Sequence, residues 1–97
     1  MSKIINAAIQ VLPKSKETDP IKIVDVAIDT ISQTGLKYVV CPFETVVEGT
    51  YKEVMSLIGS IHENCFKSGA EEIICNLKIQ SRKNNDVYID EKIGKYK

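Results

Sequence analysis

The chain has 97 residues, of which 43% are hydrophobic and 27% are charged, and thirteen basic residues balance thirteen acidic ones. This length and composition are typical of one globular domain, so they argue against two domains and against a disordered chain. The net charge of zero gives no support to a nucleic-acid-binding surface, which usually carries a basic excess.

The first predicted element is a strand over Ile4–Leu12, where two sets of alternating residues give the strand two different faces. We expect Pro13 to end this strand. Asp19 then precedes Pro20, an order typical of an N-cap followed by the first residue of a helix. Apolar residues spaced three and four apart continue the helix, and Thr34-Gly35 is expected to end it.

Two strands should follow this helix. Leu36–Cys41 is rich in aromatic and β-branched residues and predicts the second strand. The segment Pro42-Phe43-Glu44 then interrupts the pairing, because proline has no N–H to donate. Thr45–Glu48 predicts a short third strand that pairs with the second as a hairpin.

The second half of the chain repeats the order of helix and strand. Thr50 and Glu53 match the spacing of a capping box, which predicts a helix that begins here and ends at Ser68-Gly69. Glu72–Gln80 alternates again and predicts the fourth strand. Residues 82–97 form a polar C-terminal tail of the same domain, with a short extra element expected over 88–96.

This order of elements, β-α-β-β-α-β, predicts an α+β ferredoxin-like sandwich. Right-handed crossovers place both helices on one face of a four-stranded antiparallel sheet. The other face stays open, and alternation predicts that it carries a mixture of Asn6, Ala8, Gln10, Tyr38, Val40, Asn76 and Lys78. Such a face is too apolar to be simply solvated, so we expect it to pack against another subunit.

The sequence offers little that predicts catalysis. His62 is the only histidine, and it lies within the second helix, where a structural role is the more common one. The odd number and wide spacing of Cys41, Cys65 and Cys75 favour reduced, buried thiols over disulfides or a zinc site. No glycine-rich phosphate loop is present. We therefore expect no enzyme activity and no metal.

Three further expectations concern partners and location. No segment approaches the roughly 20 apolar residues of a membrane-spanning helix, and no apolar signal segment begins the chain, so we expect a cytoplasmic protein without membrane contact. RNA-recognition domains share the predicted topology, but they stack bases on aromatic residues of the first and third strands. Neither predicted strand has an aromatic residue, so we expect no nucleic acid to bind.

The segment from Tyr38 to Gly49 combines a tyrosine, a proline, a threonine and a carboxylate within predicted sheet. In one interpretation it is a bulged hairpin, with Thr45 chosen for strand propensity and Glu48 for solvent. In the other it is a ligand site, where the Thr45 hydroxyl forms a hydrogen bond and Glu48 accepts from an amine or balances a cation. Strict alternation places these two side chains on opposite faces, so one pocket can use both only at a bulge or a strand end.

Several short motifs resemble those of the thiamine-binding protein family. They are Gly35-Leu36-Lys37-Tyr38, then Pro42, Thr45 and Glu48-Gly49, followed by His62 and Gly69-Ala70. The resemblance covers nearly the whole chain and extends to Arg82. Members commonly carry an acidic residue soon after this arginine, whereas here Lys83-Asn84-Asn85 come before Asp86.

The resemblance implies a ferredoxin-like protein that assembles through its open sheet face, as a homotetramer built from two dimers. It also implies a ligand, thiamine or its hydroxymethylpyrimidine part, and no other cofactor. On the motif positions, Tyr38, Thr45 and Glu48 become candidate ligand-binding residues. Strand alternation adds Asn6, Gln10 and Asn76.

We compare three functions on this basis. The leading hypothesis is a non-catalytic binding protein for thiamine or a related pyrimidine, with its site between subunits. The alternative is a structural or regulatory oligomer without a small ligand, in which the partner closes the open face. A small enzyme that uses Glu48 as a base is the third, and the sequence names no substrate for it.

Overall fold

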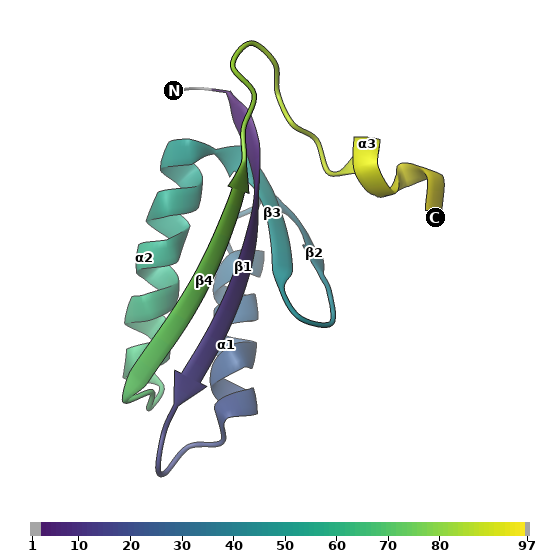
Figure 1. Ribbon diagram of the computed structural model, residues 1–97. Helices are drawn as coiled ribbons and strands as arrows, with labels where there is room; N and C mark the ends of the chain where they lie inside the picture. Colours follow the sequence, from purple (N-terminus) through teal and green to yellow (C-terminus); the bar gives the residue numbers. More distant parts are fainter. Residues whose placement is uncertain (1–2, 97) are drawn as a thin grey trace.

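The computed structural model describes residues 3–96 and shows a four-stranded antiparallel sheet with the strand order β2-β3-β1-β4. The strands are β1 (Ile4–Lys14), β2 (Lys37–Val40), β3 (Thr45–Thr50) and β4 (Glu72–Gln80). The helices α1 (Pro20–Ser32) and α2 (Tyr51–Lys67) form the two crossovers. This is the predicted α+β ferredoxin-like βαββαβ fold, and Figure 1 shows both long helices on the same side of the sheet.

The signals that begin and end the helices act as the sequence predicted. The Asp19 side chain accepts from the backbone N–H of Ile21, and Pro20 occupies the first helical turn. At α2, Thr50 and Glu53 form the complete capping box, because each side chain bonds the other's backbone N–H. These bonds satisfy backbone donors that have no partner within the helix.

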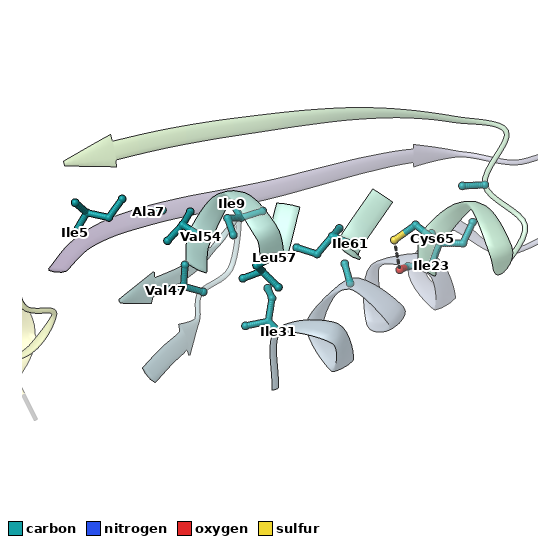
Figure 2. Close-up of a cluster of buried hydrophobic side chains, with 12 residues drawn as sticks. Ile5, Ala7, Ile9, Ile23, Ile31, Val47, Val54, Leu57, Ile61 and Cys65 are labelled. Atoms are coloured by element: carbon teal, nitrogen blue, oxygen red, sulfur yellow. Dashed lines mark hydrogen bonds between the residues drawn. The ribbon is translucent and has the colours of Figure 1, made fainter. Parts of the chain in front are cut away.

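Buried aliphatic side chains fill the space between the sheet and the two helices (Figure 2). Strands β1 and β3 supply one side of this core, and α1 and α2 supply the other. The most enclosed members include Ile23, Ile31, Val47, Val54 and Ile61, each at most 2% exposed. Cys65 lies among them, and its thiol donates to the backbone carbonyl of Ile23 at 3.7 Å.

Strand β1 does not end at Pro13, as the sequence predicted, but continues to Lys14. Pairing with β3 stops at Ile9, whereas pairing with β4 continues to Lys14. Beyond Ile9 the strand therefore has a neighbour on one side only. A proline is tolerated there, because its missing N–H is not needed by a second neighbour.

The register also corrects the expected open face. Tyr38 pairs with Val47, which is fully buried, so Tyr38 and Val40 belong to the face that the helices cover. Val39 takes their place on the open face, opposite Val46. Residues 38–41 are all apolar or aromatic. They show no polar alternation, so the sequence could not predict which of them face the helices.

The end of the chain is more structured than the predicted polar tail. A short helix α3 (Asp90–Ile93) and a 3-10 turn η1 (Gly94–Tyr96) follow β4 after a connecting loop. Figure 1 shows this part of the chain in yellow, on the side of the sheet opposite to α1 and α2. The chain thus covers part of its own open face.

Candidate functional site

The site is formed where residues 86–93, here called the C-terminal segment, cross the open face of the sheet. Val87 and Ile89 are 0% and 3% exposed, although they lie in a region that the sequence marked as polar. The segment is fixed to the first strand, since the Val87 N–H donates to the Ile4 carbonyl at 3.0 Å. The Ile4 N–H in turn donates to the Asp86 carboxylate at 2.8 Å.

Asn6 connects the centre of the sheet with this segment. Its side chain is buried, at 4% exposure, and its Nδ2 donates to the Val87 carbonyl at 2.9 Å. Its Oδ1 accepts from the Lys92 ammonium at 3.0 Å. Both ends of the amide are therefore used within the chain, which fixes the orientation of the side chain.

Glu48 and Lys37 hold the segment from the other side. The Glu48 carboxylate accepts from the Ile89 N–H at 2.7 Å, and the Lys37 ammonium pairs with Asp90 at 2.5 Å. The hydrogen bond to Asp90 raises the pKa of Lys37, and partial loss of water from the ammonium offsets part of this effect. Glu48 thus positions a wall of the site in this structure.

Between the C-terminal segment and the sheet lies a cavity of about 500 Å³, here called the open-face cavity. Its floor is apolar and comes from three neighbouring strands, with Val39, Val46 and Ala8 side by side. Ile89 and Ile93 contribute an apolar wall. The volume falls within the range of small-molecule sites, which are mostly apolar with a few placed polar groups.

The polar groups at this cavity are two amides and two ammoniums, from Asn6, Gln80, Lys78 and Lys92. Among the described residues, no carboxylate lines it. Lys78 has a distant ion-pair partner, the Glu44 carboxylate, at 3.7 Å. Amide groups can recognise the edge of a heteroaromatic ring, because each offers both donors and an acceptor.

The structure divides the six predicted ligand residues among three places. Asn6 lines the open-face cavity, and Glu48 lies beside it on the same face. Gln10 and Asn76 bond to each other at 3.0 Å further along that face and do not line the cavity. Tyr38 and Thr45 lie on the helix face.

Thr45 is 5% exposed and lines a different, smaller cavity of about 190 Å³. This space lies between α1 and the loop that joins β2 to β3. Thr45 and Glu48 are therefore on opposite faces, as strict alternation requires, with no bulge between them in the β1–β3 pairing. The structure does not bring these two motif residues together.

Sequence reasoning missed Lys92 and Gln80 as lining residues and underestimated the C-terminal segment. The signal was present in Val87-Tyr88-Ile89, where two apolar residues alternate within polar surroundings. The sequence also gave no indication of the ion pair that Arg82 forms. Its guanidinium donates to the Asp86 carbonyl at 3.0 Å and pairs with Glu91 at 2.5 Å, although no acidic residue follows it closely.

The described residues form no centre suited to metal chemistry. Within residues 3–96, no group of three His, Cys, Asp or Glu side chains is placed to hold a metal ion. His62 has its Nδ1 2.9 Å from the Ile58 carbonyl, one turn earlier on the same helix. Burial raises the pKa of the Cys65 and Cys75 thiols, which keeps them protonated near neutral pH.

None of the described helices is long and apolar enough to cross a bilayer.

Comparison with known sequences identifies similar proteins over nearly the whole chain. A family described as thiamine-binding protein matches residues 7–97. A protein of Clostridium perfringens named only as a UPF0045 protein is 35% identical, over 95% of this chain and 96% of its own length. A UPF0045 protein of Bacillus subtilis is 29% identical over 60% of this chain and 56% of its own.

Two solved structures have the same architecture along almost their full length. A domain of unknown function from Bacillus cereus superposes with a TM-score of 0.93 at 34% identity, covering 99% of this chain and 92% of that one. A candidate thiamine biosynthesis/salvage protein of Thermotoga maritima superposes with a TM-score of 0.87 at 29% identity, covering 97% and 99%. The fold of residues 3–96 is therefore that of these proteins.

Proposed function

Because the chain belongs to the thiamine-binding protein family, we propose that it binds thiamine or its hydroxymethylpyrimidine part in the open-face cavity, without catalysing a reaction. The observation that carries this proposal is the cavity itself. Its volume of about 500 Å³ suits a ligand of this size, and its apolar floor suits a flat ring. We place the protein in the cytoplasm, where its free thiols remain reduced.

The lining residues support specific contacts for a pyrimidine. The ring would lie on Ala8, Val39 and Val46, and the amides of Asn6 and Gln80 would bond its edge. Glu48 contributes by holding Ile89 in the wall. Tyr38, Thr45, Gln10 and Asn76 make no ligand contact in this proposal, because they lie outside the cavity.

A second copy of the chain completes the proposal. The C-terminal segment covers only one end of the open face, and Leu12 and Ile74 lie directly opposite each other at the other end. They are 43% and 47% exposed. We propose that this part of the face joins subunits, in a homotetramer built from two dimers, and so brings the cavities close to subunit interfaces.

Isothermal titration calorimetry on the ligand-free protein tests the binding. We expect heat on titration with thiamine or hydroxymethylpyrimidine, and loss of that heat in the variant Ala8→Phe, whose larger side chain fills the floor of the cavity. Ile21→Phe enlarges an exposed apolar residue of α1 that lies outside the cavity and should bind as the wild type does. Absence of heat with every pyrimidine tried would refute the proposal.

The alternative of an oligomer without a small ligand makes the opposite prediction. Native mass spectrometry of the protein purified from cells would then show a mass without an adduct. Saturating pyrimidine would also leave the thermal transition unchanged, whereas a ligand that binds only the folded state raises it.

A further inference from the structure

The charges at the open-face cavity do not match a cationic ligand. Its two charged lining groups are the ammoniums of Lys78 and Lys92, and no described carboxylate lines it. The thiazolium ring of thiamine carries a positive charge, which these two ammoniums repel. A ligand with a negative group complements the same cavity, because opposite charges attract most strongly where water is partly excluded.

Lys92 has the capacity to bind an anion. Its ammonium donates to the neutral Oδ1 of Asn6, and an ammonium has three N–H donors. The carboxylates on its own helix are directed to other partners, since Asp90 pairs with Lys37 and Glu91 pairs with Arg82. The hydrogen bond from Arg82 first, and the charge of Lys92 more weakly, lower the pKa of Glu91, so this carboxylate balances the Lys92 ammonium only in part.

Lys78, which lines the same cavity from β4, has similar capacity. Its side chain is 78% exposed, and its partner Glu44 lies 3.7 Å away, beyond the range of a short charge-assisted hydrogen bond. Exposed ion pairs of this kind contribute little to stability, so this one can open at little cost. Lys78 extends from β4 opposite Ala8, whose side chain is part of the cavity floor.

Resting on the function proposed above, we propose that the cavity binds the phosphorylated form of the pyrimidine in preference to the uncharged or cationic form. The ring lies on the apolar floor of Ala8, Val39 and Val46. The phosphate monoester is held by the ammoniums of Lys92 and Lys78. Lysine is a common phosphate ligand in proteins and acts there as a point charge.

Calorimetry on two matched ligand pairs tests the preference. One pair is hydroxymethylpyrimidine with its monophosphate, and the other is thiamine with thiamine monophosphate. Charge-assisted hydrogen bonds predict that the phosphorylated member of each pair binds on the order of tenfold to a hundredfold more tightly. The preference should shrink as salt is added, because salt screens exposed charges.

Two variants assign the preference to the lysines. Lys92→Met keeps the aliphatic stem and removes the charge, and Lys78→Met does the same without removing any hydrogen bond to Asn6. Each should reduce the affinity for the phosphorylated ligand while leaving that for hydroxymethylpyrimidine within about twofold, since neutral ring contacts do not depend on the charge. Lys95→Met changes a lysine of η1 that does not line the cavity and is the matched control.

The outcomes separate this inference from the function on which it rests. If neither member of either pair binds, the proposed function fails, and the inference fails with it. If both members of a pair bind with equal affinity, the function stands and the phosphate preference is refuted. A preference that survives in both Lys92→Met and Lys78→Met would also refute it, because the anion would then be held elsewhere.

Discussion

Asn6 shows how one side chain can join a sheet to the segment that covers it. Its position in β1 faces away from the helices, where the sequence predicted a half-polar surface open to a partner. Instead the side chain is 4% exposed and bonded at both ends, to Val87 and to Lys92. The amide also lines the open-face cavity, and it keeps a second N–H and a second lone pair beyond these two bonds.

Removal of this amide should weaken the fold measurably. In Asn6→Ala, the Val87 carbonyl loses its buried donor, so we expect the free energy of unfolding to fall by about 1–3 kcal/mol. Urea denaturation measures this change. Asn76→Ala is the control, because the Asn76 side chain is exposed and bonds only Gln10, and it should change stability by less than about 0.5 kcal/mol. Equal losses in the two variants would contradict the role given to Asn6.

Two glycines should respond to alanine with opposite signs. Gly69 has a φ of 112°, and a Cβ there would overlap Thr18, so Gly69→Ala combines backbone strain with a clash and should destabilise the protein. Gly59 lies within α2, and a Cβ there meets nothing within 4 Å. Gly59→Ala should therefore stabilise it by about 0.5–1 kcal/mol. Thermal melting of both variants checks the two signs, and a shift in the same direction would show that this account is wrong.

At the residue scale, the sequence predicted the elements better than it predicted the faces. The fourth strand was predicted at its observed bounds, because Ile73, Cys75, Leu77 and Ile79 alternate clearly with other residues. In β2, apolar residues run without alternation, so only the pairing of Tyr38 with Val47 decides which side chains face the helices. That pairing depends on the hairpin loop and is not encoded in the strand itself.

Among the elements, the C-terminal segment departs most from expectation. Polar composition predicted a tail with a short extra element, yet it supplies Val87 and Ile89 as buried residues and Lys92 as a cavity residue. Its attachment depends on contacts between residues more than eighty positions apart, such as the bond of Ile4 to Asp86. Local periodicity contains no information on such pairs, which is why the cavity could not be predicted from the sequence.

The attachment of this segment should depend on pH through Asp86. Bonds from the Ile4 N–H first, and from the Tyr88 hydroxyl second, lower the pKa of Asp86 in the folded state. A carboxyl with a lowered pKa adds stability above its unfolded pKa of about 3.9, and this stability is lost as the pH falls through the folded pKa. We therefore expect the segment to loosen in acid, below about pH 4.

Hydrogen exchange at the Val87 amide measures this loosening, because that N–H bonds to the Ile4 carbonyl. After correction for the intrinsic pH dependence, its protection should fall in acid in the wild type. In Asp86→Asn it should be lower at neutral pH and nearly independent of pH. Glu91 is the other carboxyl of the segment whose pKa is lowered, in this case by its hydrogen bond to Arg82. Glu91→Gln is therefore the control, and it should keep the wild-type pH dependence. A wild-type protection constant across this range would contradict the prediction.

On the scale of the whole molecule, the sequence predicted both the order of elements and the family. The assembly into a homotetramer is a proposal. The part of the open face that the C-terminal segment leaves uncovered presents Leu12 and Ile74 to solvent. If subunits join there, Leu12→Glu should shift the protein toward a smaller particle in light scattering at micromolar concentration, because a charge cannot be buried unpaired in an apolar interface.

Ile21→Glu is the matched control for this experiment. Ile21 is 70% exposed on α1, away from the open face, so the charge should leave the particle mass unchanged. A wild-type mass equal to one chain would refute self-association directly. An equal effect of both variants would show that the interface does not specifically use the open face.

The contact between the two ends of the described chain also bears on how the protein is made. Strand β1 leaves the ribosome before the other described elements, but its neighbour β4 and the residues that bond to Ile4 and Asn6 leave it after α2. A nascent chain can bring α1, β2, β3 and α2 together before then, with the opposite face of β1 still bare. This domain therefore completes its fold during synthesis only when residues 72–93 emerge, and until that moment the growing polypeptide exposes a surface on which chaperones or neighbouring nascent chains can act.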